Sequence, residues 1–176
     1  MALEFIQLDK NTGDKRLRDA CQLEGIVGCE LLPRSVRDET DDVVLEYIIR
    51  EQFVTFTFDR SIHQMWGHIL AGRNPGLIIL RADDDSIRQI NTKTAAPELR
   101  RFKREFPQWN QVSYQHSVVE ITPTLVFVYQ TWNATPQQTW WSKRSQAGWP
   151  AELANQLLVN AAGPLPKGNS IESHLS

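Results

Sequence analysis

An acidic residue directly follows one of the most apolar segments of this chain. The segment 53–58 is a run of β-branched and aromatic residues, a pattern typical of a buried β-strand. Asp59 comes next. Packing alone does not explain a carboxylate at that position, whereas the carboxyl ends of parallel strands are where α/β sheets bind their ligands. The sequence therefore predicts a polar site at the end of this strand, and several carboxylates meeting there would form a site for a hard cation.

Two further acids occupy comparable positions. Asp9 ends the short apolar segment 5–8, and Asp41 opens an apolar helical run that Thr40 can cap. In a βαβ arrangement that helix leads into the strand that precedes Asp59. Taken singly, Asp9 is also explained as the start of a turn, and Asp41 as an acid at the positive end of a helix. Taken together, the three acids predict a metal site.

The rest of the chain alternates between strand and helix patterns as far as about residue 130. Strands are expected at 5–8, 28–32, 53–58, 77–80, 117–121 and 125–129, and helices at 14–24, 41–50, 62–71 and 97–106. Such alternation indicates an α/β fold with a mainly parallel central sheet and helices on both faces.

Four short motifs resemble one known family. They read Leu8-Asp9-Lys10-Asn11, then Thr40-Asp41-Asp42-Val43-Val44-Leu45, then Phe56-Thr57-Phe58-Asp59-Arg60-Ser61-Ile62, and finally Gly76-Leu77-Ile78-Ile79-Leu80. In order and spacing they are similar to motifs of the small PIN-like domains often encoded with bacterial toxin–antitoxin loci. The resemblance covers residues 4–130.

The resemblance implies a three-layer PIN-like nuclease fold and a divalent-metal-dependent ribonuclease. Asp9, Asp41 and Asp59 would hold Mg²⁺ or Mn²⁺ and thereby carry the catalysis. The preference for RNA comes from the resemblance and from no residue that can be read directly. The resemblance also leaves room for an antitoxin-like protein partner and for a homodimer.

Two positions depart from the family pattern. Lys10 stands where the family has Glu, and Ser61 stands where it has a second Asp. These changes make the site roughly three charge units less negative, which weakens binding of a divalent cation. The hydroxyl of Ser61 can still hold a metal-bound water, while Asn11 and Thr57 are expected to orient Asp9 and Asp59. A catalytically weak or inactive PIN-like module that acts by binding nucleic acid or protein is therefore the alternative.

Basic residues indicate where a polyanion would lie, although the chain as a whole carries a net charge of -2. Lys10 and Arg60 flank the predicted site. A denser cluster lies on the helix that precedes Phe106, and it consists of Arg100, Arg101, Lys103 and Arg104. Phosphate contact is the functional interpretation of this cluster, and a solvated helix face is the structural one.

The composition changes after residue 130, so we expect a PIN-like domain over 1–130 and a partly disordered C-terminal extension over 131–176. The extension holds four of the six tryptophans, Trp132, Trp140, Trp141 and Trp149. These rings could cover the domain's own apolar surface, anchor a partner protein, or stack on single-stranded nucleic acid. We expect the sheet to be complete by Tyr129 and residues 1–130 to fold without the extension.

The opening residues show no basic region followed by an apolar stretch, and no apolar run reaches membrane-spanning length. We therefore expect a cytoplasmic protein without membrane association.

Restoring the family acid at position 61 tests the predicted metal site. Ser61→Asp adds a negative oxygen ligand, so Mn²⁺ affinity measured by calorimetry should rise. Unchanged binding in this variant would mean that position 61 does not face the metal.

Overall fold

The computed structural model describes residues 5–8, 14–25, 29–57, 71–81, 92–133 and 137–164. In chain order these residues form β1 (Phe5–Leu8), α1 (Asp14–Leu23), β2 (Cys29–Leu31), α2 (Arg34–Arg37), α3 (Asp41–Glu51), β3 (Val54–Thr57), β4 (Leu77–Leu80), α4 (Thr92–Glu105), β5 (Ser117–Ile121), β6 (Leu125–Gln130), β7 (Gln137–Lys143) and α5 (Trp149–Ala162). The helix expected over 62–71 falls almost entirely outside this part of the chain.

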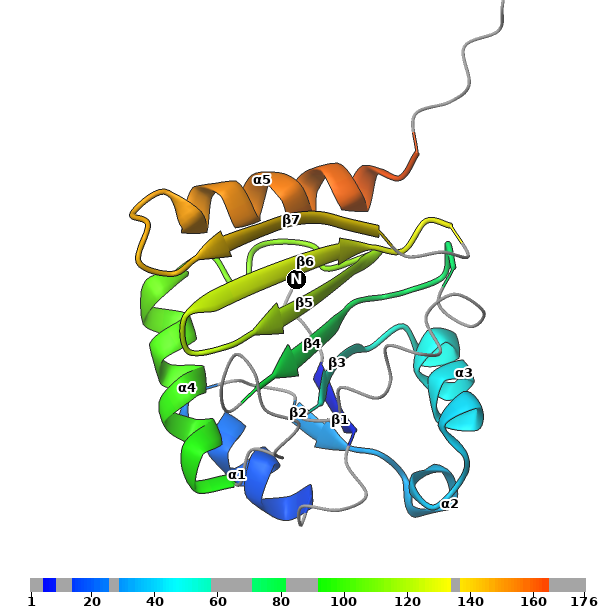
Figure 1. Cartoon of the computed structure of the whole chain (residues 1–176). Helices are drawn as coiled ribbons and strands as arrows, with labels where there is room; N and C mark the ends of the chain where they lie inside the picture. The colour runs from blue at the N-terminus through cyan, green and yellow to red at the C-terminus, as the bar shows by residue number, and fades with distance from the viewer. Residues whose placement is uncertain are drawn as a thin grey trace, which may run out of the picture.

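All the strands belong to one sheet, in the order β2-β1-β3-β4-β5-β6-β7 (Figure 1). The pairings from β2 across to β5 are parallel. The last two pairings, β5 with β6 and β6 with β7, are antiparallel. The expected α/β class with a mainly parallel sheet is therefore confirmed.

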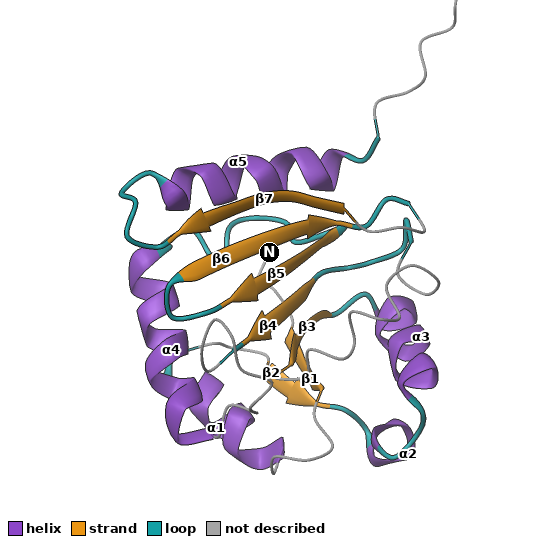
Figure 2. Ribbon diagram, in the orientation of Figure 1, coloured by secondary structure: helices purple, strands orange, loops and turns teal. Residues whose placement is uncertain are grey.

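The central strands are buried on both faces. In β4, Ile78 and Leu80 pack into one hydrophobic cluster, whereas Leu77 and Ile79 pack into another. Because side chains alternate along a strand, the two clusters lie on opposite faces of the sheet. Helices α1, α4 and α5 contribute to the first cluster, and α3 contributes to the second. Figure 2 shows α4 and α1 at the left of the view and α3 at the right.

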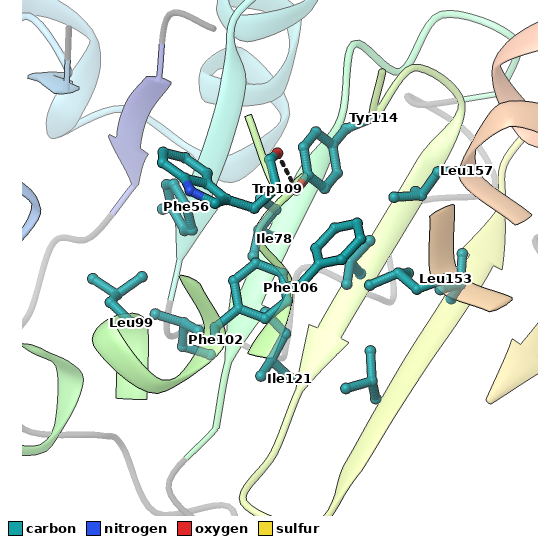
Figure 3. Close-up of a cluster of buried hydrophobic side chains, with 14 of the residues drawn as sticks. Phe56, Ile78, Leu99, Phe102, Phe106, Trp109, Tyr114, Ile121, Leu153 and Leu157 are labelled. Carbon is teal, nitrogen blue, oxygen red and sulfur yellow. Dashed lines mark hydrogen bonds between the residues drawn. The ribbon is translucent and has the colours of Figure 1, made fainter. Parts of the chain in front are cut away.

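Aromatic residues fill the larger cluster, on the face that α4 and α5 cover (Figure 3). Phe102 and Phe106 lie with their ring centroids 5.6 Å apart, and Phe106 lies 6.2 Å from the ring of Trp149. The hydroxyl of Tyr114 donates a 2.7 Å hydrogen bond to the carbonyl of Trp109, which satisfies the one polar group of this buried ring. This cluster therefore joins α4, the sheet and α5.

The sequence predicts a sheet that is complete by Tyr129, but the observed sheet extends further. It continues through β7, and α5 then packs on the sheet with Trp149, Leu153 and Leu157 buried. The boundary expected at residue 130 therefore cuts the chain between two paired strands. The rings differ in their roles, since Trp149 is 3% exposed and covers the core whereas Trp141 is 52% exposed.

Truncation of Leu157 tests whether α5 is part of the core. Leu157 is 0% exposed, so Leu157→Ala should lower the free energy of unfolding in urea by about 2–5 kcal/mol. The neighbouring Leu158 is 72% exposed, and Leu158→Ala should change it by less than about 0.5 kcal/mol. Equal effects of the two substitutions would mean that α5 does not hold the buried position described here.

Candidate functional site

The order of the parallel strands reverses between β1 and β3. After β1 the chain adds β2 on one side, and it then returns to place β3, β4 and β5 on the other side. The resulting order 2-1-3-4-5 creates a switch point at the carboxyl ends of β1 and β3. Open α/β sheets bind their ligands at such points, because the connecting segments leave in different directions and open a crevice.

Two of the predicted acids directly follow the strands that meet at this switch point. Leu8 and Thr57, the last residues of β1 and β3, are register partners. Asp9 comes one position after Leu8, and Asp59 two positions after Thr57. The acids themselves lie outside the described residues, and so do Lys10, Asn11, Arg60 and Ser61.

The third acid, Asp41, is the first residue of α3 and is exposed. Because α3 connects the end of β2 with the start of the parallel strand β3, its first turn lies on the carboxyl side of the sheet. The preceding residue Thr40 has the extended backbone of an N-cap, but its hydroxyl hydrogen bonds to the carboxylate of Asp42 and does not cap the helix. That hydrogen bond lowers the pKa of Asp42 below its ordinary value. Asp42 thus accepts a hydrogen bond from Thr40, and Asp41 is the acid of this turn that is predicted to bind metal.

One row of register partners crosses the sheet close to the same edge. From β1 to β7 it consists of Leu8, Thr57, Ile79, Glu120, Phe127 and Trp141. From β3 onward the side chains of these residues share one face, since directly paired residues of neighbouring strands point to the same side. Thr57, predicted to orient Asp59, is 1% exposed in this row.

A buried ion pair occupies the middle of this face and was missed by the sequence analysis. Arg81 follows β4, and its Nη1 donates a 2.8 Å hydrogen bond to Oε1 of Glu120 in β5. The two side chains are 6% and 0% exposed. A buried charge pair of this kind needs further hydrogen bonds to offset its desolvation, so it fixes the local arrangement firmly. The available signal was a single acid, Glu120, inside the otherwise apolar segment 118–121.

The basic residues of α4 differ in their surroundings. Arg100 bonds Glu24 at 2.7 Å, Arg101 bonds Glu105 at 2.8 Å, and the ammonium of Lys103 lies 5.8 Å from the ring centroid of Trp109. Arg104 is exposed. Of the six basic residues predicted to contact phosphate, the four on α4 are described, and three of these have a partner within the protein.

Within the described ranges, no group of three His, Cys, Asp or Glu residues is arranged to hold a metal ion. Across the same ranges, no helix is both long and apolar enough to cross a membrane. Comparison with protein-family models, with characterised proteins and with solved structures gives no match.

Removing one member of the buried pair should destabilise the protein strongly. Arg81→Met leaves the carboxylate of Glu120 buried beside a neutral side chain, which should cost about 3–5 kcal/mol in urea unfolding. The matched control is Arg73→Met, which breaks a pair with Glu46 of equal length, 2.8 Å, at the exposed surface, and it should have little effect.

A second substitution in the same background separates lost charge from lost packing. The double variant with Arg81→Met and Glu120→Met should recover most of the stability, because neither charge of this pair is then left buried without the other. A double variant as unstable as Arg81→Met alone would contradict this account of the pair.

Proposed function

We propose that this protein is a PIN-like, divalent-metal-dependent endoribonuclease whose site lies at the switch point between β1 and β3. The observation that carries the proposal is the combination of strand order and sequence. In the sequence, Asp9 and Asp59 come one and two positions after the ends of the two strands that meet at the reversal. A three-layer PIN-like arrangement is the finer form of the α/β fold that fits this site.

The acids fit a hard cation by their chemistry. Carboxylate oxygens are the ligands that Mg²⁺ and Mn²⁺ prefer, and Mg²⁺ keeps several waters and therefore needs only a few carboxylates. Asp41 is exposed in the first turn of α3, where its carboxylate remains open to a ligand. Asp9, Asp41 and Asp59 would hold the ion, which when bound activates water and stabilises charge on a phosphodiester.

A second function has its own supporting observation. Lys10 and Ser61 replace two acids of the family pattern, so the local charge available to a metal is reduced. A PIN-like module that binds nucleic acid or a protein partner with weak or no catalysis would tolerate such replacements. The two functions differ in whether a divalent cation binds and is needed.

Two neighbouring acids on α3 provide the sharpest test. Asp41→Asn removes a proposed metal ligand, so Mn²⁺-dependent cleavage of single-stranded RNA should fall by at least about tenfold, and Mn²⁺ affinity should fall with it. Asp42→Asn makes the same chemical change one residue away, at a carboxylate engaged by Thr40, and should leave both properties nearly unchanged.

The outcome also decides between the two functions. Cleavage by the unaltered protein that is lost in EDTA and in Asp41→Asn supports the nuclease. Binding of RNA without Mn²⁺ binding at millimolar concentration favours the non-catalytic module. Equal loss in Asp41→Asn and Asp42→Asn would contradict the assignment of Asp41 as a ligand.

A further inference from the structure

The hairpin of β6 and β7 has two different faces. In β6, buried and half-buried residues alternate, unlike β3, β4 and β5, whose residues are all buried. Val126 and Val128 point into the cluster that α5 covers. Leu125, Phe127 and Tyr129 therefore point to the opposite face, where they are only half buried.

Three aromatic rings lie in series on this opposite face, and we refer to Tyr129, Phe127 and Trp141 as the aromatic row. The centroid of Phe127 lies 6.3 Å from that of Tyr129, with an angle of 21° between the ring planes. It also lies 6.3 Å from the ring centroid of Trp141, with an angle of 25° between the ring planes. The rings are thus nearly parallel, and the outermost, Trp141, is 52% exposed. Contiguous apolar surface that is exposed to solvent is a feature of interaction sites.

The aromatic row leads to a basic pocket. Lys143 is the register partner of Leu125, at the end of the hairpin that lies beside the carboxyl end of β5. A pocket of about 390 Å³ opens there, lined by Arg101, Pro123, Thr124, Leu125, Lys143, Arg144 and Ser145. Arg101 and Arg144 are bonded to acids of α4, whereas Lys143 is exposed. The pocket therefore offers an accessible cation next to Leu125, which lies two residues before Phe127 in β6.

The same face connects the aromatic row with the switch point. Phe127 and Trp141 belong to the row of register partners that includes Thr57. Three strand intervals separate β3 from β6, a distance of roughly 14 Å. Ile79 and Glu120 lie buried between the two places, so a ligand that contacts both would pass along the carboxyl edge of the sheet and not across this face.

We infer that the aromatic row and Lys143 bind single-stranded nucleic acid, with bases stacked on Trp141 and Phe127 and a phosphate beside Lys143. This inference rests on the proposed function, since it names the surface that holds the substrate. Nearly parallel rings suit the planar faces of unpaired bases, and every base has such a face. The cation at the end of the row suits the phosphate backbone.

The test measures binding without catalysis. Fluorescence anisotropy of a fluorescein-labelled oligouridine, recorded in EDTA at low salt, reports affinity when no metal is present. Trp141→Ala should weaken binding by about tenfold or more, and Trp141→Phe should recover most of the loss, because a stacking ring remains. Lys143→Gln should lower the slope of log affinity against log salt by about 0.7, as loss of one phosphate contact to a single strand requires.

Two controls separate the surface from general effects. Leu158→Ala removes another exposed apolar side chain, on α5 and away from this face, and should bind like the unaltered protein. Circular dichroism of Trp141→Ala should be unchanged, since the residue lies on an edge strand and is half exposed. Oligodeoxyuridine in a parallel series shows whether the surface distinguishes RNA from DNA, which share stacking and phosphate contacts.

The results also distinguish this inference from the proposed function. Binding that depends on Trp141 in EDTA, together with no Mn²⁺-dependent cleavage, supports the binding surface and contradicts the nuclease. Equal affinity of Trp141→Ala and the unaltered protein overturns the inference even if cleavage is observed. Absence of binding to both oligonucleotides also overturns it, and would point to a protein partner for the exposed rings.

Discussion

The buried guanidinium of Arg144 joins four parts of the C-terminal half of this fold. Its side chain is 1% exposed, and it donates hydrogen bonds to Glu98, to Glu105 at 2.7 Å and to the carbonyl of Thr122 at 2.8 Å. The same guanidinium lies over the ring of Trp149, 5.9 Å from its centroid. One side chain thus joins α4, the turn between β5 and β6, the end of β7 and the start of α5. The pKa of Glu105 lies below its ordinary value, since burial raises it but hydrogen bonds from Arg101 and Arg144 outweigh burial. Because a buried charge is costly unless its partners are in place, this network fixes where the hairpin sits against α4.

The sequence predicts the central strands well because local pattern and burial agree there. The strands expected at 77–80 and 117–121 have the observed bounds, since both are short runs of residues buried on each face. The helix start expected at Pro97 is wrong, because α4 begins at Thr92 and accommodates the proline within the helix. Strand β7 was missed for a different reason. It opens with Gln137 and Gln138, and an edge strand paired on one side only needs no apolar run, so its place depends on pairing with β6 that no local pattern reveals.

Some residues of the candidate site can be recognised from the sequence, and others cannot. Acids that follow strands can be recognised from the sequence, because the carboxyl ends of parallel strands share an edge. The pair of Arg81 and Glu120 could not be derived in this way, since its members are 39 positions apart and meet only through the register of β4 with β5. The role of the aromatic residues was equally hidden. In the sequence the tryptophans form one group. In the structure Trp149 is buried at the start of α5, whereas Trp141 is exposed on β7.

The row of register partners also has a fixed length. Backbone hydrogen bonds fix the spacing between β3 and β7, so the sheet sets the distance from the end of β3 to Trp141, with Ile79 and Glu120 buried between them. If the proposed nuclease binds its substrate both at the metal site and on Trp141, this fixed distance sets a minimum substrate length. A fragment long enough to span the interval gains from both contacts at once, whereas a shorter one is held at a single place and dissociates sooner. Selection by length would then be a property of the backbone ladder, independent of base sequence.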